Sequence, residues 1–486
     1  MQDTLGAPRP VSSRGIVPLI ALAVIALVIG AGAAQLGAQA FLPIFGLLVV
    51  TIIIARPEYG VALLLSTFLM AYPQWIQGSG YLTLNNVLGG IFAVLLTYEV
   101  YRSQDWWFVR VPQVQLLLVI VGLYWLSESI NSPDPEKVNL LGAGFYHAEG
   151  LRIFVNRVAF TLFFIMFIRS PRNVRMIYML ALAFMMITAL SGVQNVLAGG
   201  GLKGYRAFTG ASDLVTGQVG VIRAAGNPNR LAMFAVLAIG GLWYLMQSIR
   251  SMTSRVVIVP LLVTLALAVF LTASRSGLVG LVLCTGVIVL DGGFDIRKLF
   301  TVILAGLLLA VVTVQFVPER NLERILNLPG RESAEVGEGD ASLERRQGVW
   351  VLTWELFKDN PVLGVGMGNW AVVRFIRDPG WSAGSPHNSF LLALVEGGPF
   401  VLIAFGMLLW YTWRDIRVAE YYVRLPEFPL AYLTWIVKAT KVSLLVFIFF
   451  SLVADLFNLV LLFMLIGFAV SLRRIVELTA RGEVLA

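Results

Sequence analysis

The chain reads SPHNSFLL at residues 385–392, and this stretch opens the apolar helix around which the rest of the sequence is organised. It follows the longest polar segment and precedes an apolar run that continues to Trp413. His387 within it is one of only two histidines in 486 residues. Imidazole is the side chain whose ordinary pKa lies nearest to neutral pH. A histidine at this position is either a packed interfacial residue or a group that exchanges protons.

The composition is that of an integral membrane protein. Hydrophobic residues make up 58% of the chain and charged residues 13%, with a mean hydropathy of +0.82. Apolar runs of about 17–25 residues are long enough to cross a bilayer core as helices. The single cysteine, Cys284, excludes a disulfide framework and a zinc–cysteine cluster. The net charge of +8 needs no nucleic-acid partner, because Lys and Arg flank membrane helices on their cytoplasmic side.

The sequence therefore predicts an all-α fold, a polytopic transmembrane helix bundle of about 14 spans with one large periplasmic loop subdomain. The predicted spans lie near residues 16–34, 41–55, 59–77, 85–102, 113–130, 154–169, 174–197, 230–248, 256–272, 277–291, 299–316, 387–413, 439–454 and 456–472. The first run resembles a signal peptide. Because a second run follows at once, we expect an uncleaved first span.

Four regions are expected along the chain. They are the N-terminal transmembrane helices (1–198), transmembrane helices with Arg-bearing periplasmic loops (199–316), a large periplasmic loop with amphipathic helices (317–386) and the C-terminal transmembrane helices (387–486). The segments predicted inside carry more Lys and Arg than the short segments predicted outside, which indicates that both termini are cytoplasmic.

The large loop contains a segment, from Arg345 to Lys358, that is helical by pattern. Trp350 and Trp354 within it are four residues apart and share one face. We expect this helix to lie on the membrane surface or to pack against the helix bundle.

Several arginines lie on the predicted outer side, against the charge rule. Arg275 falls in a tight hairpin, where it is either an interfacial anchor or a fixed cation for a lipid-linked phosphate. Arg223 precedes an Asn-Pro-Asn turn, in which Asn227 or Asn229 is expected to cap the next span. Capping explains the asparagines, but it does not explain Arg223 and Arg206 on a short outer loop.

Glu396 follows His387 by nine residues, which is half a turn out of phase on an ideal helix. Glu396 is therefore not expected to orient His387 directly unless the Gly397-Gly398 pair or Pro399 distorts the helix. We expect it to pair with an arginine of a neighbouring span, such as Arg157. The chain has no Walker loop and no compact outer cluster of histidines and carboxylates. We expect neither a metal nor a cofactor.

Four short motifs occur in order within residues 200–415. They are Arg223 with NPN at 227–229, TASRSG at 272–277, NPVLGVG at 360–366, and PHNS at 386–389 followed by EGG at 396–398. In this order they resemble the bacterial O-antigen ligase and O-antigen polymerase superfamily.

The resemblance implies a metal-independent, inverting glycosyltransferase. It would move a glycan from undecaprenyl diphosphate to a sugar hydroxyl on the periplasmic face of the bacterial inner membrane, in O-antigen or exopolysaccharide biosynthesis. His387 would be the general base. The arginines that would hold the diphosphate are Arg223, Arg275, Arg206, Arg345 and Arg346. The supporting positions would be Asn229, Ser274, Asn388 and Glu396.

The acceptor separates two activities within this class. A polymerase would use a second lipid-linked repeat unit, and a ligase would use lipid A–core. The number of spans and the long N-terminal region favour the polymerase. Polysaccharide assembly or chain-length proteins are further candidate partners. A flippase of the lipid-linked glycan is the rival from another class, but transporters tend to show repeats and broken helices at the midplane. A non-catalytic scaffold is the third alternative.

Overall fold

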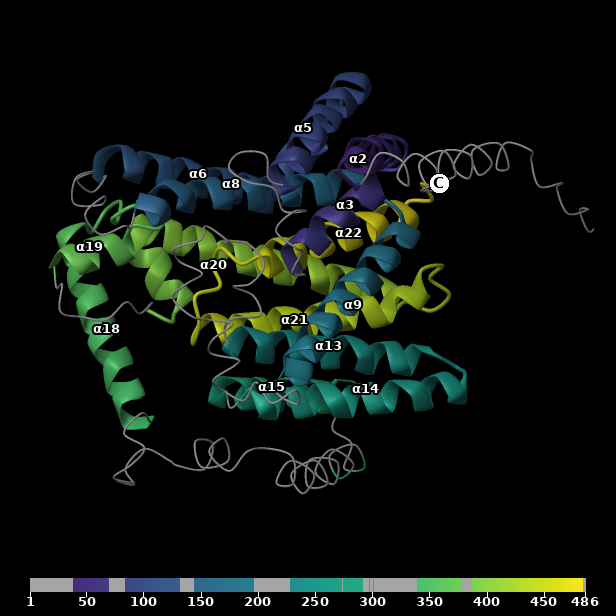
Figure 1. Cartoon of the computed structure of the whole chain (residues 1–486). Helices are drawn as coiled ribbons and strands as arrows, with labels where there is room; N and C mark the ends of the chain where they lie inside the picture. Colours follow the sequence, from purple (N-terminus) through teal and green to yellow (C-terminus); the bar gives the residue numbers. More distant parts are fainter. Residues whose placement is uncertain are drawn as a thin grey trace, which may run out of the picture. The chain divides into compact units, whose positions relative to one another are not determined.

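In a computed structural model, the described residues are 38–69, 84–131, 144–195, 228–272, 274–291, 297, 300, 339–377 and 386–483. Within these ranges every regular element is helical (Figure 1). The elements are α2 (Ala38–Ala55), α3 (Pro57–Leu69), α5 (Leu84–Ser103), η2 (Trp107–Arg110), α6 (Pro112–Asn131), α8 (Gly144–Phe167), α9 (Pro171–Asn195), α13 (Pro228–Ser248), α14 (Met252–Leu271), α15 (Arg275–Leu290), α18 (Gly339–Asp359), α19 (Trp370–Arg377), α20 (Ser389–Val423), η4 (Ala431–Leu433), α21 (Thr434–Ser451) and α22 (Val460–Ala480).

The chain forms two compact units, Met1–Gly60 and Val61–Ala486. Eight of the described helices are long and apolar enough to cross a membrane. They are α5, α6, α8, α9, α13, α14, α20 and α21. Shorter apolar helices occupy Gly46–Ala55, Pro57–Leu69 and Arg275–Leu290. An all-helical fold with several candidate membrane spans is thus confirmed among the described residues. The predicted spans at 16–34 and 299–316 lie outside the described residues, so about 14 spans remains a prediction.

Helices α20, α21 and α22 run through the middle of the second unit, with α6 and α8 on one side and α13, α14 and α15 on the other (Figure 1). Aromatic side chains join these layers: the ring of Phe457 stacks on Phe154 of α8 at 5.4 Å and meets Phe405 of α20 edge-on at 4.8 Å. Lipid tails are as apolar as the side chains, so such helices associate through close packing more than through exclusion from water.

Helix α20 is kinked at Gly398, whose φ is 71°. Pro399 has no N–H to offer, so the carbonyl of Val395 loses its partner within the helix. The backbone N–H of Val365 donates to that carbonyl at 2.9 Å, and the N–H of Gly366 donates to the carbonyl of Glu396 at 2.9 Å. The NPVLGVG motif is therefore the loop that docks onto the kink of α20.

Helix α18 precedes this loop, and it confirms the helix predicted from Arg345 to Lys358. Its buried Val349 and Leu356 pack with Trp370 of α19 and Val395 of α20. Of the two expected locations, α18 therefore takes the one against the helix bundle.

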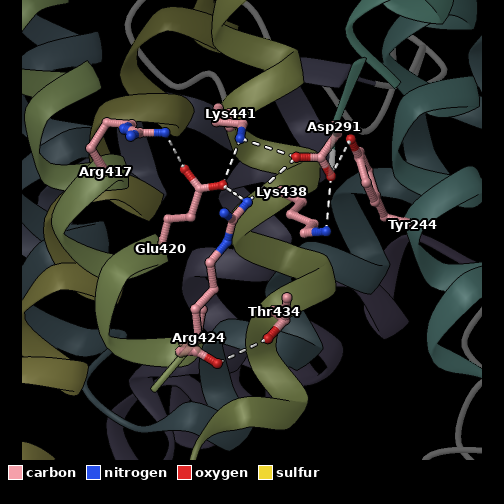
Figure 2. A network of polar contacts seen from close by, with 9 residues as sticks. Tyr244, Asp291, Arg417, Glu420, Arg424, Thr434, Lys438 and Lys441 are labelled. Atoms are coloured by element: carbon pink, nitrogen blue, oxygen red, sulfur yellow. Dashed lines mark hydrogen bonds and ion pairs between the residues drawn. The ribbon is translucent and has the colours of Figure 1, made fainter. Parts of the chain in front are cut away.

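A network of charged side chains ties the far ends of α20 and α21 to the end of α15 (Figure 2). Lys441 Nζ lies 2.6 Å from Glu420 Oε1 and 3.4 Å from Asp291 Oδ1, while Lys438 Nζ lies 2.9 Å from Asp291 Oδ2. Arg424 also contacts Glu420. Each buried carboxylate is thus paired with more than one cation, which offsets the cost of its desolvation.

Candidate active site

His387 precedes the first turn of α20 and is held there by its neighbours. Asn388 caps the helix, because its Oδ1 accepts from the backbone N–H groups of Phe390 and Leu391 at 3.0 Å each. Trp350 of α18 donates its Nε1–H to the carbonyl of Pro386 at 2.7 Å. The φ of His387 is 50°, in the left-handed region that few residues other than glycine adopt. Such strain costs roughly 1–3 kcal/mol and persists where the surroundings hold it.

The carboxylate of Asp455, in the loop between α21 and α22, faces His387. Its Oδ2 lies 3.9 Å from His387 Nδ1, and its Oδ1 accepts the backbone N–H of Asn388 at 3.1 Å. Ser389 fastens the same loop, since its Oγ donates to the carbonyl of Ala454 and accepts the N–H of Leu456, both at 2.8 Å. The start of α20 therefore fixes where this carboxylate points.

Burial lowers the pKa of His387 below its ordinary value. Asp455 acts against this shift, and the charges of Arg346 and Arg230 reinforce it. The lowered pKa favours the neutral imidazole, which is the form that accepts a proton. Arg230 also donates from Nη2 to the backbone carbonyl of Asp455 at 3.1 Å, so it helps to hold the loop in place.

The starts of α13 and α15 are joined by hydrogen bonds. Asn229 Oδ1 accepts from Ser274 Oγ at 2.7 Å and from Ser276 Oγ at 3.1 Å. Ser274 is also the N-cap of α15, accepting the N–H of Gly277 at 2.9 Å. Arg275 is the first residue of α15 and is exposed. Because Arg230 follows Asn229, these contacts connect the Arg275 hairpin to the loop that carries Asp455.

Apart from Glu396, the predicted site residues divide into three groups. Those that the structure connects to one another through hydrogen bonds or electrostatic contact are His387, Asn388, Arg346, Asn229 and Ser274 with the adjacent Arg275. Arg223 and Arg206 lie outside the described residues. Arg345 belongs to α18, but its side chain also falls outside them. Among the residues that are described, no three His, Cys, Asp or Glu side chains form a group that could hold a metal ion.

The expected pair between Glu396 and Arg157 is wrong. Glu396 is buried at the kink of α20, where its Oε1 accepts the backbone N–H of Trp370 at 3.4 Å. This amide begins α19 and has no acceptor within its own helix. The guanidinium of Arg157 instead lies 3.8 Å over the ring of Phe68. Glu396 therefore helps to fasten α19 to the bundle.

Two site residues were not predicted, Asp455 and Arg230. Asp455 had a signal in the sequence, because it is a single carboxylate between two predicted spans, 439–454 and 456–472. Charged residues that remain next to apolar runs are costly and often functional. Arg230 directly follows the Asn-Pro-Asn turn, but nothing in the sequence indicates a contact with residues 225 positions later.

A model of the O-antigen ligase family matches residues 260–406 of the chain. The matched segment runs from α14 into α20 and contains Ser274, Arg275, Arg346 and His387. Arg230 and Asp455 lie outside it. No curated protein matches the chain. The match confirms the resemblance drawn from the motifs.

Proposed function

Residues 260–406 belong to the O-antigen ligase family, and from this premise we propose that the protein is a membrane glycosyltransferase. It moves a glycan from undecaprenyl diphosphate to a sugar hydroxyl, in the synthesis of a bacterial surface polysaccharide. The reaction takes place on the periplasmic face of the inner membrane, and both termini are cytoplasmic. The observation that carries the proposal is the position of His387 at the start of α20, within the matched segment, where its Nδ1 lies 3.9 Å from Asp455.

In the proposed reaction, the acceptor hydroxyl attacks the anomeric carbon of the donor sugar. The hydroxyl proton passes to Nε2 of His387, because Nδ1 faces Asp455. The new glycosidic bond forms as the bond from the anomeric carbon to the phosphate oxygen breaks, and that electron pair leaves with undecaprenyl diphosphate. The attack inverts the anomeric centre. Asp455 stabilises the imidazolium until the proton returns to solvent. The distance of 3.9 Å exceeds a hydrogen bond, as is common before a substrate binds.

The arginines stabilise the departing diphosphate. Guanidinium groups stay charged and bind phosphate oxygens in pairs, which favours charge that develops on the leaving group. Arg275 and Arg346 are the described candidates, and Arg223, Arg206 and Arg345 complete the set. The donor is already activated by its diphosphate linkage, so the proposed reaction needs no nucleotide and no metal.

We take a second lipid-linked repeat unit as the acceptor, which makes the enzyme a polymerase. The long N-terminal helical region supports this choice. Lipid A–core as acceptor would make it a ligase. A chain-length or assembly protein is a further proposed partner.

The test is a reaction with purified protein in lipid vesicles and an undecaprenyl-diphosphate oligosaccharide as the only sugar substrate. His387→Ala is the test variant, and His147→Ala, at the only other histidine, is the matched control. A ladder of longer lipid-linked glycans, lost in His387→Ala and kept in His147→Ala, supports the polymerase.

A product that forms only after lipid A–core is added would instead identify a ligase. Full transfer by His387→Ala would overturn the assigned base. If the wild type transfers no glycan with either acceptor but moves the intact donor across the vesicle membrane, the protein is a transporter and the proposal fails.

A further inference from the structure

Three covered N–H groups without an acceptor lie at the end of the helix bundle away from His387. They are Trp107 Nε1 in η2, Arg169 Nε just after α8, and Arg474 Nη1 in α22, and none has a hydrogen-bond partner among the described residues. Nearly all buried polar groups in folded proteins are hydrogen-bonded. Three unsatisfied donors in one region therefore indicate a missing acceptor.

Arg474 links the other two side chains. The guanidinium of Arg474 lies 3.4 Å over the ring of Trp107, and the charges of Arg474 and Arg169 act on one another unfavourably. Arg169 is paired with Glu99 through Nη1 at 3.1 Å, which leaves its Nε uncompensated. Asp105 and Glu483 attract Arg474, but neither lies within ion-pair distance of it among the described contacts. Carboxylates thus balance the charge of the two arginines, and three of the described N–H groups are left without an acceptor, which suits a ligand with several acceptor oxygens.

Helix α6, which begins just after Trp107, extends from the cluster to the candidate active site. At one end of α6, Asn131 Nδ2 donates to the carbonyl of Gly364 at 2.7 Å, next to the kink of α20. At the other end of α6, Gln113 Nε2 donates to Asp415 Oδ2 at 2.7 Å, and η2 precedes this point. If α6 crosses the bilayer, the cluster lies at the opposite membrane surface from His387.

Exposed aromatic side chains surround this end of the bundle. Tyr101 of α5 is 77% exposed, and Trp106, just before η2, is 55% exposed. Tyrosine and tryptophan concentrate at the level of the lipid head groups, where one side of the ring is apolar and the other is wet. The two exposed rings support a position of this end of the bundle at the level of the head groups.

We propose that Trp107, Arg169 and Arg474 form a binding site for the phosphate group of an anionic membrane lipid. Basic pockets between membrane helices bind such head groups, because guanidinium and indole N–H groups donate to phosphate oxygens. A free phosphate ion has the same donor requirements, but the surrounding aromatic residues favour a lipid, whose acyl chains would lie along them. The site is separate from the proposed transferase site.

The experiment measures thermal unfolding of the full chain in an uncharged maltoside detergent during titration with phosphatidylglycerol. Trp107→Phe keeps the ring and removes the N–H group, and Arg474→Met removes the guanidinium. Arg481→Gln is the matched control, since it removes one charge from an exposed position at the end of the same helix. We expect each test variant to weaken the apparent lipid affinity by about tenfold, the effect of losing one charge-assisted hydrogen bond. The control should bind like the wild type.

Trp107→Phe also separates binding from folding. It removes an unsatisfied donor, so its unfolding temperature without lipid should not fall, while its response to phosphatidylglycerol should. Equal affinities in the wild type and both test variants would overturn the proposal. Equal stabilisation by diacylglycerol, which has no phosphate, would overturn it as well. If inorganic phosphate alone stabilises the protein as much as phosphatidylglycerol does, the ligand is a free phosphate ion and the proposed lipid site is wrong.

Discussion

The imidazole of His387 receives opposing influences from single residues. Burial, Arg346 and Arg230 favour its neutral form, and Asp455 favours its charged form. The net result is a lowered pKa, which a general base working at neutral pH requires, because it must be unprotonated before each turnover. Because Asp455 and Arg346 shift the pKa of His387 in opposite directions, their substitutions should shift it in opposite directions as well.

We expect the glycan-transfer rate of the wild type to hold at neutral pH and to fall on acidification, with the acid midpoint of kcat/KM below 6.5, the ordinary pKa of histidine. The sign follows from the base: protonation below its pKa removes the acceptor for the hydroxyl proton. A pH–rate profile measures this midpoint. A midpoint above 6.5 would contradict the neutral imidazole.

Asp455→Asn and Arg346→Gln should move that midpoint in opposite directions. Asp455 raises the pKa of His387, so its neutralisation shifts the midpoint to lower pH, and Arg346 lowers that pKa, so its loss shifts the midpoint to higher pH. Asp455→Asn should also reduce kcat by about 10²-fold or more, because His387 loses the carboxylate that orients its ring and stabilises its charged form. Shifts of the same sign would show that electrostatic coupling to His387 is not their cause.

At the level of secondary-structure elements, the kink of α20 positions the site. It releases two carbonyls that accept from Val365 and Gly366, and these hydrogen bonds hold the loop that connects α18 to α19. Helix α18 in turn holds Pro386, the residue before His387, through Trp350. The route from the kink to the base passes through packed elements, each of which can be weakened separately.

Gly398→Ala should lower the free energy of unfolding of the purified protein by roughly 2–4 kcal/mol. Alanine is strained at this positive φ, and its Cβ would overlap the carbonyl oxygen of Val362. Gly406→Ala in the same helix is the control, since a Cβ there meets nothing within 4 Å. We expect it to be neutral or stabilising by up to about 1 kcal/mol. Equal effects of the two substitutions on the free energy of unfolding would contradict the strain and overlap expected at Gly398.

Trp350→Phe should reduce kcat severalfold while costing about 1 kcal/mol of stability, because it removes one hydrogen bond and frees the backbone before His387. Trp354→Phe, one turn along the same helix and 49% exposed, should leave both quantities close to wild type. Kinetics of transfer and thermal unfolding, measured on the same samples, compare the two. A larger kinetic effect at Trp354 would contradict the role assigned to Trp350.

On the scale of the whole second unit, the two ends of the helix bundle carry different polar side chains. His387, Asp455 and the hairpin of Arg275 gather at one end, and the paired carboxylates Asp291 and Glu420 lie at the other (Figure 2). The network of Asp291 and Glu420 joins α15, α20 and α21 and does not include His387. Substitutions in this network should therefore change the free energy of unfolding and leave kcat unchanged.

Lys441→Met should destabilise the protein by roughly 2–3 kcal/mol, because Asp291 and Glu420 keep other cations and lose only part of their compensation. Arg417→Gln, at a side chain that is 56% exposed, should cost less than about 1 kcal/mol. The kcat of the folded fraction should be unchanged in both, as measured by transfer rates normalised to folded protein. A loss of kcat in Lys441→Met would connect this network to the reaction.

The sequence by itself was enough for the helical membrane class, because span length and hydropathy follow directly from a bilayer without water. It also indicated the family, because the resemblance depends on local motifs and their order. The roles of His387 and Arg275 remain predictions. The N-caps at Ser274 and Asn388 are local as well: a polar side chain before an apolar run satisfies the first amides of its own helix.

Only the tertiary structure decided which residues meet. The contact between His387 and Asp455 joins positions 68 residues apart. Glu396 accepts the amide N–H of Trp370 because α19 follows the loop that docks at the kink of α20. An ideal helix would have placed that carboxylate half a turn from the base, without indicating its partner. Hydropathy indicates which segments can lie in a membrane, but it does not indicate which neighbour a side chain contacts. That choice depends on how the helices pack, and packing combines side chains from the whole chain.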